Sequence, residues 1–136
     1  MNGLAGGTVL EVAVKLPMTT GRHATVADAR VAFEDTHVHM LLITEDGRLL
    51  GTLVREDLPP HTDEAAPALD HAVLRGRTIG PDVPAEQARQ LLLARAERRL
   101  AVVDHNQRLL GLLCLKRRLH GFCRDDDVRA RGSRVA

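Results

Sequence analysis

The sequence predicts an α/β (α+β) protein made of two similar halves. The segment 48–53, RLLGTL, recurs at 108–113 as RLLGLL, and five of the six positions match at a constant offset of 60. An apolar run of strand length and a polar turn precede each copy, and a helix-like segment precedes each run. Self-similarity at a fixed spacing is the signature of an internal repeat, so each half is expected to hold the same elements in the same order.

In the first half, Thr8 and Glu11 predict a capping box for a short helical turn, and Thr25 predicts the cap of a longer helix. The β-branched, apolar pattern before Gly47 predicts one strand of a hairpin, and this glycine supplies the positive φ of the turn. The elements expected here are a helical turn at 9–14, an extended segment at 16–20, a helix at 25–35, strands at 38–44 and 48–54, and a helical turn from 55.

The second half predicts the same series. Pro84 suits the first turn of a helix, and Asn106 at the tip of the second hairpin tolerates a left-handed conformation. The elements expected are a short helix at 69–74, an extended segment at 77–80, a helix at 84–98, strands at 100–103 and 108–113, and a closing segment at 115–122.

A three-stranded sheet with helices on one side leaves its other face uncovered. Two such halves are therefore expected to pack sheet to sheet around a shared core, because one half alone is too small to be stable.

The composition and the motif content argue against several classes of function. Nineteen basic and eighteen acidic residues leave a net charge of +1, and the chain has two phenylalanines but no tyrosine or tryptophan. The composition therefore disfavours nucleic-acid binding as the function, since single strands are bound on aromatic platforms and in basic grooves. No signal peptide and no apolar stretch long enough to span a membrane is evident, so a cytoplasmic protein is expected. Catalytic motifs such as GxSxG, HExxH or a P-loop are absent from the sequence, so no enzymatic activity is expected.

The repeated hairpin, with a Gly in its second strand, and the Asp in the helical turn after the first copy resemble the CBS (cystathionine-β-synthase) domain, which occurs in tandem pairs called Bateman modules. The resemblance places one repeat at 8–60 and another at 69–123, with a linker at 61–68 and flexible tails at 1–7 and 124–136. It implies two clefts between the repeats, a regulatory role through a ligand such as AMP, ADP, ATP or S-adenosylmethionine, a homodimer, and a regulated protein partner that the sequence does not identify.

The resemblance also implies the site residues. Asp57 stands where the family has the carboxylate that accepts hydrogen bonds from both ribose hydroxyls, and Val54 replaces the family's hydroxyl side chain. In the second repeat Cys114 replaces the hydroxyl and Arg117 the carboxylate, so that cleft is expected to be empty or to take a phosphate. The remaining expected ligand contacts come from the extended segments and the first strand: Thr19, Thr20, Thr78, Ile79, His39 and Leu41.

Other interpretations remain open. Asp57 also suits a plain helix cap, and the departures from the family pattern allow a degenerate module that only dimerises or acts as a scaffold. His37 and His39 alternate along a strand but are too few for a structural zinc site, so no metal is expected. Cys114, in an apolar run, is expected to be a buried, unreactive thiol. Weaker alternatives are anion or nucleic-acid binding through Arg117, Arg118, His120 and Arg124, and a metal at Asp125, Asp126 and Asp127.

Overall fold

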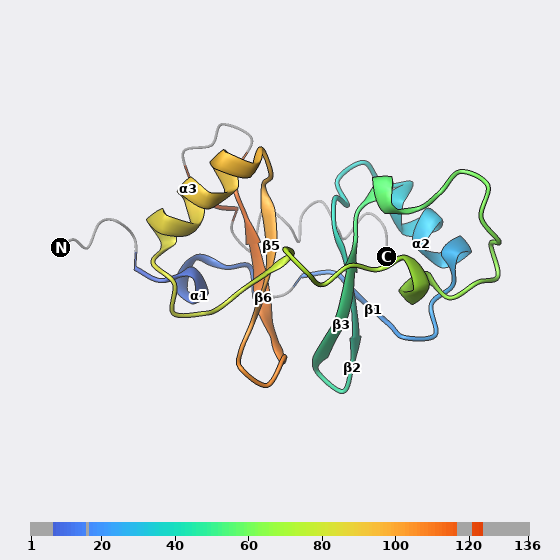
Figure 1. Ribbon diagram of the computed structural model, residues 1–136, viewed down its shortest axis with the longest axis horizontal. Helices are drawn as coiled ribbons and strands as arrows, with labels where there is room; N and C mark the ends of the chain where they lie inside the picture. Colours follow the sequence, from blue (N-terminus) through green and yellow to red (C-terminus); the bar gives the residue numbers. More distant parts are fainter. Residues whose placement is uncertain (1–6, 16, 117–120, 124–136) are drawn as a thin grey trace.

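The computed structural model describes residues 7–15, 17–116 and 121–123, which form two lobes with a three-stranded sheet each (Figure 1). The predicted α/β fold of two similar halves is confirmed. The helices and strands are α1 (Val9–Val12), β1 (Thr19–Gly21), α2 (Val26–Phe33), β2 (Leu41–Glu45), β3 (Arg48–Leu53), the 3-10 turns η2 (Arg55–Asp57) and η3 (Ala68–His71), β4 (Thr78–Ile79), α3 (Ala85–Arg95), β5 (Arg99–Val103) and β6 (Leu109–Cys114).

The two sheets have the same topology. In each, the first strand is parallel to the second and the second is antiparallel to the third. Both hairpins shift register at the same place, between Ile43 and Thr44 in one and between Val102 and Val103 in the other. The internal repeat is therefore a repeat of structure as well as of sequence.

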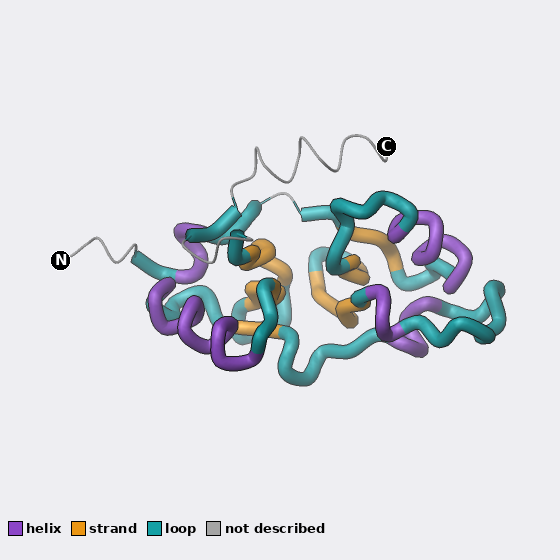
Figure 2. Tube along the Cα trace, turned by 90° about the horizontal axis from the view of Figure 1, so that it is seen from above, coloured by secondary structure: helices purple, strands orange, loops and turns teal. Residues whose placement is uncertain are grey.

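Residues alternate between two faces along each strand, and this alternation builds the core. Leu41 and Ile43 pack against the helix of the first lobe, whereas Leu42 between them packs against the other sheet. In β5, Ala101 and Val103 likewise join the cluster shared by both sheets. Figure 2 shows the two sheets facing each other, with helices on the outer sides. The predicted sheet-to-sheet packing is confirmed.

Two expected elements have different limits. The strand predicted at 38–44 starts at Leu41, because the loop after α2 continues to Val38, whose amide donates to the Asp35 carbonyl at 3.0 Å. The helix predicted to reach residue 98 ends at Arg95. Ala96 follows in the left-handed conformation with φ of 55°, and the Glu97 amide donates to the Leu92 carbonyl, as in a Schellman motif.

The short segments before the sheets are exchanged between the lobes. Val9 and Ala13 pack in the core of the second lobe, and Val14 forms a β-bridge with Leu112 of β6. Conversely, Ala68 of η3 packs in the core of the first lobe. The repeat boundaries at 8–60 and 69–123 stay a prediction. The contacts show that the short segment before β1 packs in the second lobe, and that the short segment before β4 packs in the first lobe.

This exchange explains the repeated glycine. A Cβ at Gly51 would lie 2.5 Å from Cβ of Ala72, and one at Gly111 would lie 2.6 Å from the carbonyl oxygen of Val14. Each glycine therefore lets the exchanged segment approach the last strand of a sheet.

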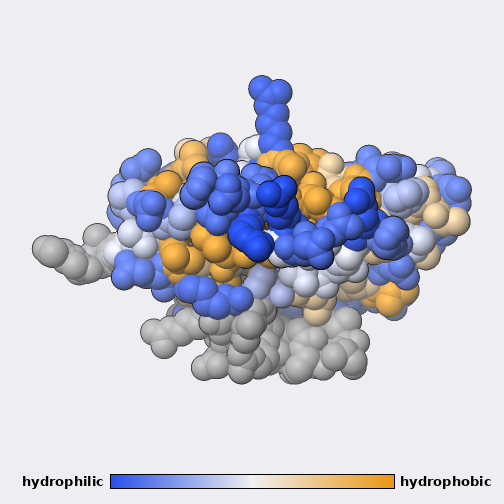
Figure 3. Space-filling view, turned by 90° about the horizontal axis from the view of Figure 1, so that it is seen from below, coloured by the Kyte–Doolittle hydropathy of each residue, from blue (hydrophilic) through white to orange (hydrophobic). Residues whose placement is uncertain are grey.

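The tips of the two hairpins lie together. The Leu49 amide donates to the Gln107 carbonyl, and the Leu109 amide donates to the Gly47 carbonyl, both at 2.9 Å. Gly47 has φ of 82°, as predicted, but the left-handed residue of the second turn is Gln107 rather than Asn106. Figure 3 looks onto this face, where hydrophilic side chains gather over the middle. The residues lining the hollow there include Glu45, Asp46, Arg48 and Arg108.

Candidate ligand-binding cleft

Asp57 lies at the end of η2, the turn that follows β3. Its carboxylate folds back over the turn, and Oδ2 accepts a hydrogen bond from the Val54 amide at 2.8 Å. This is the reciprocal half of a capping box, and it satisfies an amide that the end of the strand leaves without a partner. The local geometry therefore agrees with the capping role that the sequence allowed for this residue.

The same carboxylate is held by an arginine of the other repeat. Arg77 lies directly before β4, and its Nη1 and Nη2 donate to Asp57 Oδ2 and Oδ1 at 2.8 and 3.0 Å. Nη1 also donates to Thr52 Oγ1 at 3.3 Å. The side chains of Arg77 and Asp57 are only 20% and 14% exposed. This two-pronged ion pair joins the end of the first sheet to the start of the second, in the fork geometry that strengthens such pairs.

Burial of Asp57 alone would raise the pKa of its carboxyl, but the hydrogen bonds from Arg77 and from the Val54 amide outweigh it and hold the pKa below its ordinary value. The hydrogen bond to Asp57 in turn raises the pKa of Arg77. The pair is therefore charged throughout the neutral range.

A cleft of about 320 Å³ opens beside this ion pair. Arg55 lines the cleft but already has hydrogen-bond acceptors in the protein, because its Nη2 donates to the carbonyls of Phe33 and Asp35 at 2.7 and 2.8 Å. Arg98, by contrast, has a buried Nε without a hydrogen-bond partner among the residues that the structure describes. The lining residues are His39, Met40, Val54, Arg55, Glu56, Arg77, Glu97, Arg98 and Arg99. Four arginines against two glutamates make this cleft suitable for an anionic ligand.

The expected site residues separate into three groups. His39 and Val54 line the cleft, and Asp57 is bonded to Arg77 on its wall. Leu41 lies instead in the core of the first lobe, 2% exposed, because it faces the helix side of its sheet. Five others are not among the residues that line this cleft: Thr19, Thr20, Thr78 and Ile79 lie on the first strands of the sheets, and Cys114 is buried in the shared core. Arg117 lies outside the described residues.

Sequence reasoning missed Arg77 and Arg98. Arg77 is twenty residues from Asp57 in the chain, and no local pattern links an arginine before a strand to a carboxylate of the other repeat. The signal in the sequence was that an arginine directly precedes each of the strands β4 and β5.

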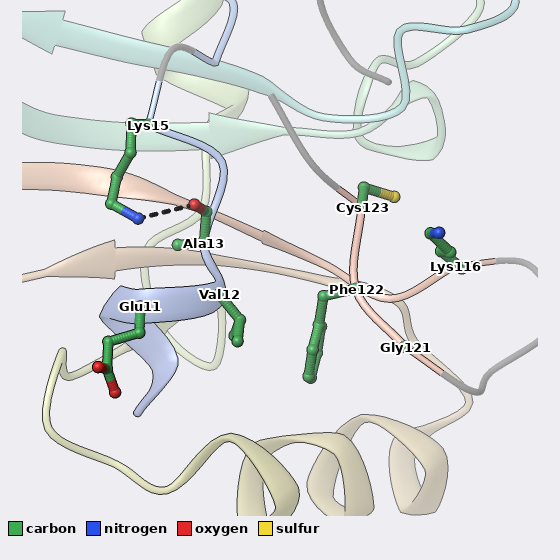
Figure 4. A pocket seen from close by; sticks show the side chains of 8 residues that line it. All are labelled: Glu11, Val12, Ala13, Lys15, Lys116, Gly121, Phe122 and Cys123. Atoms are coloured by element: carbon green, nitrogen blue, oxygen red, sulfur yellow. Dashed lines mark hydrogen bonds between the residues drawn. The ribbon is translucent and has the colours of Figure 1, made fainter. Parts of the chain in front are cut away.

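A second hollow, of about 550 Å³, lies on the second lobe between α1 and the segment after β6. Figure 4 shows Val12 and Phe122 in this hollow, and Lys15 turned back so that its Nζ donates to the Ala13 carbonyl at 3.0 Å. Residues 117–120, and with them the other predicted basic residues of this end, lie outside the described part, as do Arg124 and Asp125 to Asp127.

The two cysteines lie together at this end of the core. Both are 3% exposed and neither forms a disulfide, so the expectation of a buried thiol at Cys114 is confirmed. A hydrogen bond with Cys123, together with burial, raises the pKa of the Cys114 thiol. A thiol in this state is a poor nucleophile.

The histidines that alternate in sequence do not converge. His39 borders the cleft, whereas His37 is exposed and its Nδ1 lies 3.1 Å from Asp35 Oδ1. Within residues 7–15, 17–116 and 121–123, no group of three or more His, Cys, Asp or Glu side chains is placed to hold a metal ion. The same residues contain no helix long and apolar enough to cross a bilayer.

This architecture is that of a duplicated α/β module with a cleft between its repeats. The family model of the CBS domain matches the chain twice, at residues 9–58 and 73–122. The chain therefore belongs to the CBS domain family and contains a tandem pair of these domains. No curated protein matches the sequence.

Solved structures share the fold. CBSX2 in complex with AMP superposes with a TM-score of 0.68 at 22% identity, over 80% of this chain and 90% of that one. A CBS domain pair/ACT domain protein from Thermotoga maritima gives 0.66 at 21% identity, over 79% and 89%. The cytosolic domain of the Mg2+ channel MgtE in complex with ATP gives 0.63 at 18% identity, over 77% of this chain and 44% of that one.

Proposed function

We propose that this CBS pair is a regulatory module that binds an adenine nucleotide or a related adenosyl compound in the cleft beside Asp57. The observation that carries the proposal is a carboxylate and several arginines at one inter-repeat cleft. A carboxylate accepts hydrogen bonds from a vicinal diol, and an arginine fork fits a phosphate. Two proteins of the same fold were solved with AMP and with ATP.

Ligand binding at this cleft would act on both repeats, since Asp57 belongs to the first and Arg77 to the second. A ligand that favours one arrangement of the repeats over another would change how the module contacts its regulated partner. Homodimerisation, the identity of that partner and a cytoplasmic location stay predictions.

Thermal unfolding of the purified protein with AMP, ADP, ATP and S-adenosylmethionine tests the proposal. A ligand at a hundredfold excess over its dissociation constant adds about 2.7 kcal/mol, which corresponds to a shift of about 10 °C for a domain of this size. The shift should disappear in Asp57→Ala and persist in Arg22→Gln, which changes an exposed charge outside the cleft. No shift with any ligand at millimolar concentration would refute the proposal.

A specific observation supports the alternative of a scaffold without ligand. Arg77 donates two hydrogen bonds to the Asp57 carboxylate, which the family pattern assigns to the ligand. The Arg77–Asp57 pair therefore also suits a fixed link between the repeats. The unfolding experiment separates the two candidates, because a fixed link predicts no response to any of the four compounds.

A further inference from the structure

The carboxylate of Asp57 is nearly saturated with donors. Oδ2 accepts from the Val54 amide and from Arg77 Nη1, and Oδ1 accepts from Arg77 Nη2. A carboxylate offers about four acceptor positions, of which these bonds fill three. A vicinal diol needs one position on each oxygen, or two on one oxygen, and only Oδ1 has a position left. A diol can therefore bind at Asp57 only if Arg77 gives up at least one of its two bonds.

Arg77 cannot give up these bonds without a replacement. Its side chain is 20% exposed, so water reaches the guanidinium only in part. A partly buried charge that loses its partner is destabilised by desolvation, and an anion from the ligand is the group that restores its pairing. Phosphate suits this exchange, because its oxygens accept the same two-pronged fork that the carboxylate accepts now.

The cleft holds a second donor for such an anion. Arg98 lies on the same wall, and its Nε is buried without a hydrogen-bond partner within the described part of the chain. Arg55 is less suited to this role, since its Nη2 already donates to the carbonyls of Phe33 and Asp35. Arg98 can therefore donate to a phosphate beside the fork that Arg77 would transfer from Asp57.

We infer that the cleft selects ligands that carry a phosphate as well as a vicinal diol, and that Arg77 sets this specificity by exchanging Asp57 for the phosphate. The inference rests on the proposed function and adds to it. Adenosine supplies the diol but no anion, so it must break the Arg77–Asp57 pair without compensation. Nucleotides such as AMP carry both groups.

Calorimetric titration of the full chain with AMP and with adenosine, at one fixed ionic strength, tests the exchange. In the wild type AMP should bind at least about tenfold more tightly, which is the effect of one charge-assisted hydrogen-bond pair. In Arg77→Gln the preference should fall to about threefold or less. Adenosine should bind this variant at least as well as the wild type, since Asp57 no longer has to be released.

Controls distinguish specificity from a structural role. Arg22→Gln removes an arginine whose exposed ion pair with Glu45 lies outside the cleft, and it should keep the full preference for AMP. If Arg77 had only a structural role, Arg77→Gln would weaken AMP and adenosine equally, and this result would overturn the inference. Should Arg77→Gln fail to fold, Arg77→Lys replaces it, and a smaller AMP preference than in the wild type is then expected.

The outcomes also separate this inference from the proposed function. Binding of both ligands with equal affinity to the wild type would leave the proposed function standing and would overturn the specificity. Binding of neither ligand would overturn both.

Discussion

The ion pair between Arg77 and Asp57 makes the strongest prediction for stability. Replacing Arg77 by Ala leaves the Asp57 carboxylate with the Val54 amide as its remaining donor. Breaking a fully buried pair costs about 3–5 kcal/mol, and charged hydrogen bonds contribute about 1.5–3 kcal/mol each. Because the two side chains are 20% and 14% exposed, water replaces part of the loss. We expect Arg77→Ala to lower the free energy of unfolding by about 2 kcal/mol.

A double-mutant cycle measures the pair itself. Urea unfolding of Arg77→Ala, Asp57→Ala and the double variant should give a coupling energy of about 1–2 kcal/mol, and the cycle cancels the capping bond that Asp57 makes on its own. The exposed pair Arg22–Glu45, with side chains 47% and 42% exposed, is the matched control and should give less than about 0.5 kcal/mol. Equal coupling in the two cycles would show that burial does not strengthen the inter-repeat pair.

Two further predictions concern the exchanged segments and pH. Gly111→Ala places a Cβ 2.6 Å from the Val14 carbonyl oxygen, so we expect a loss of about 1–3 kcal/mol in urea unfolding; Gly80→Ala, which meets nothing within 4 Å, should be nearly neutral. Equal losses in both would contradict the steric explanation. The lowered pKa of Asp57 stabilises the fold above the unfolded carboxyl pKa of about 3.9, and this contribution is lost as pH falls through the folded pKa. Between pH 5 and pH 2, Asp57→Asn should therefore lose less stability than the wild type, whereas parallel pH curves would refute the assignment.

Short-range chemistry explains why much of the fold was predictable. Thr25 caps its helix as expected and forms a capping box with Asp28 through hydrogen bonds of 2.9 and 3.1 Å, and Gly47 takes the positive φ that its turn requires. Both signals lie within a few residues in the sequence. The alternation of apolar residues then implied that each sheet has a second face to cover, and the shared core follows from it.

The features that the sequence did not predict depend on contacts between residues far apart in the chain. The strand predicted from Val38 starts later because the loop after α2 continues to Val38. The carbonyls of Phe33 and Asp35 there bind Arg55, which follows β3 in the chain. Leu41 was expected at the ligand cleft, but a one-residue step along a strand reverses its face, and the sequence does not say which face is shared. Arg77 was missed because its partner lies in the other repeat. The place of Asp57 in the turn after β3 was predictable from the sequence, whereas its ion pair with Arg77 was not.

The exchange of the short segments has a consequence for the order of folding. Val14 pairs with Leu112, so the start of the chain finds its place only after β6 has been synthesised. The first lobe, in turn, is incomplete until the segment with Ala68 has followed β3. Closing such long loops slows folding, since chain entropy is lost before the contacts form. A ribosome-bound chain that stops after the first repeat therefore has neither lobe complete, and we expect the two domains to fold as one cooperative unit.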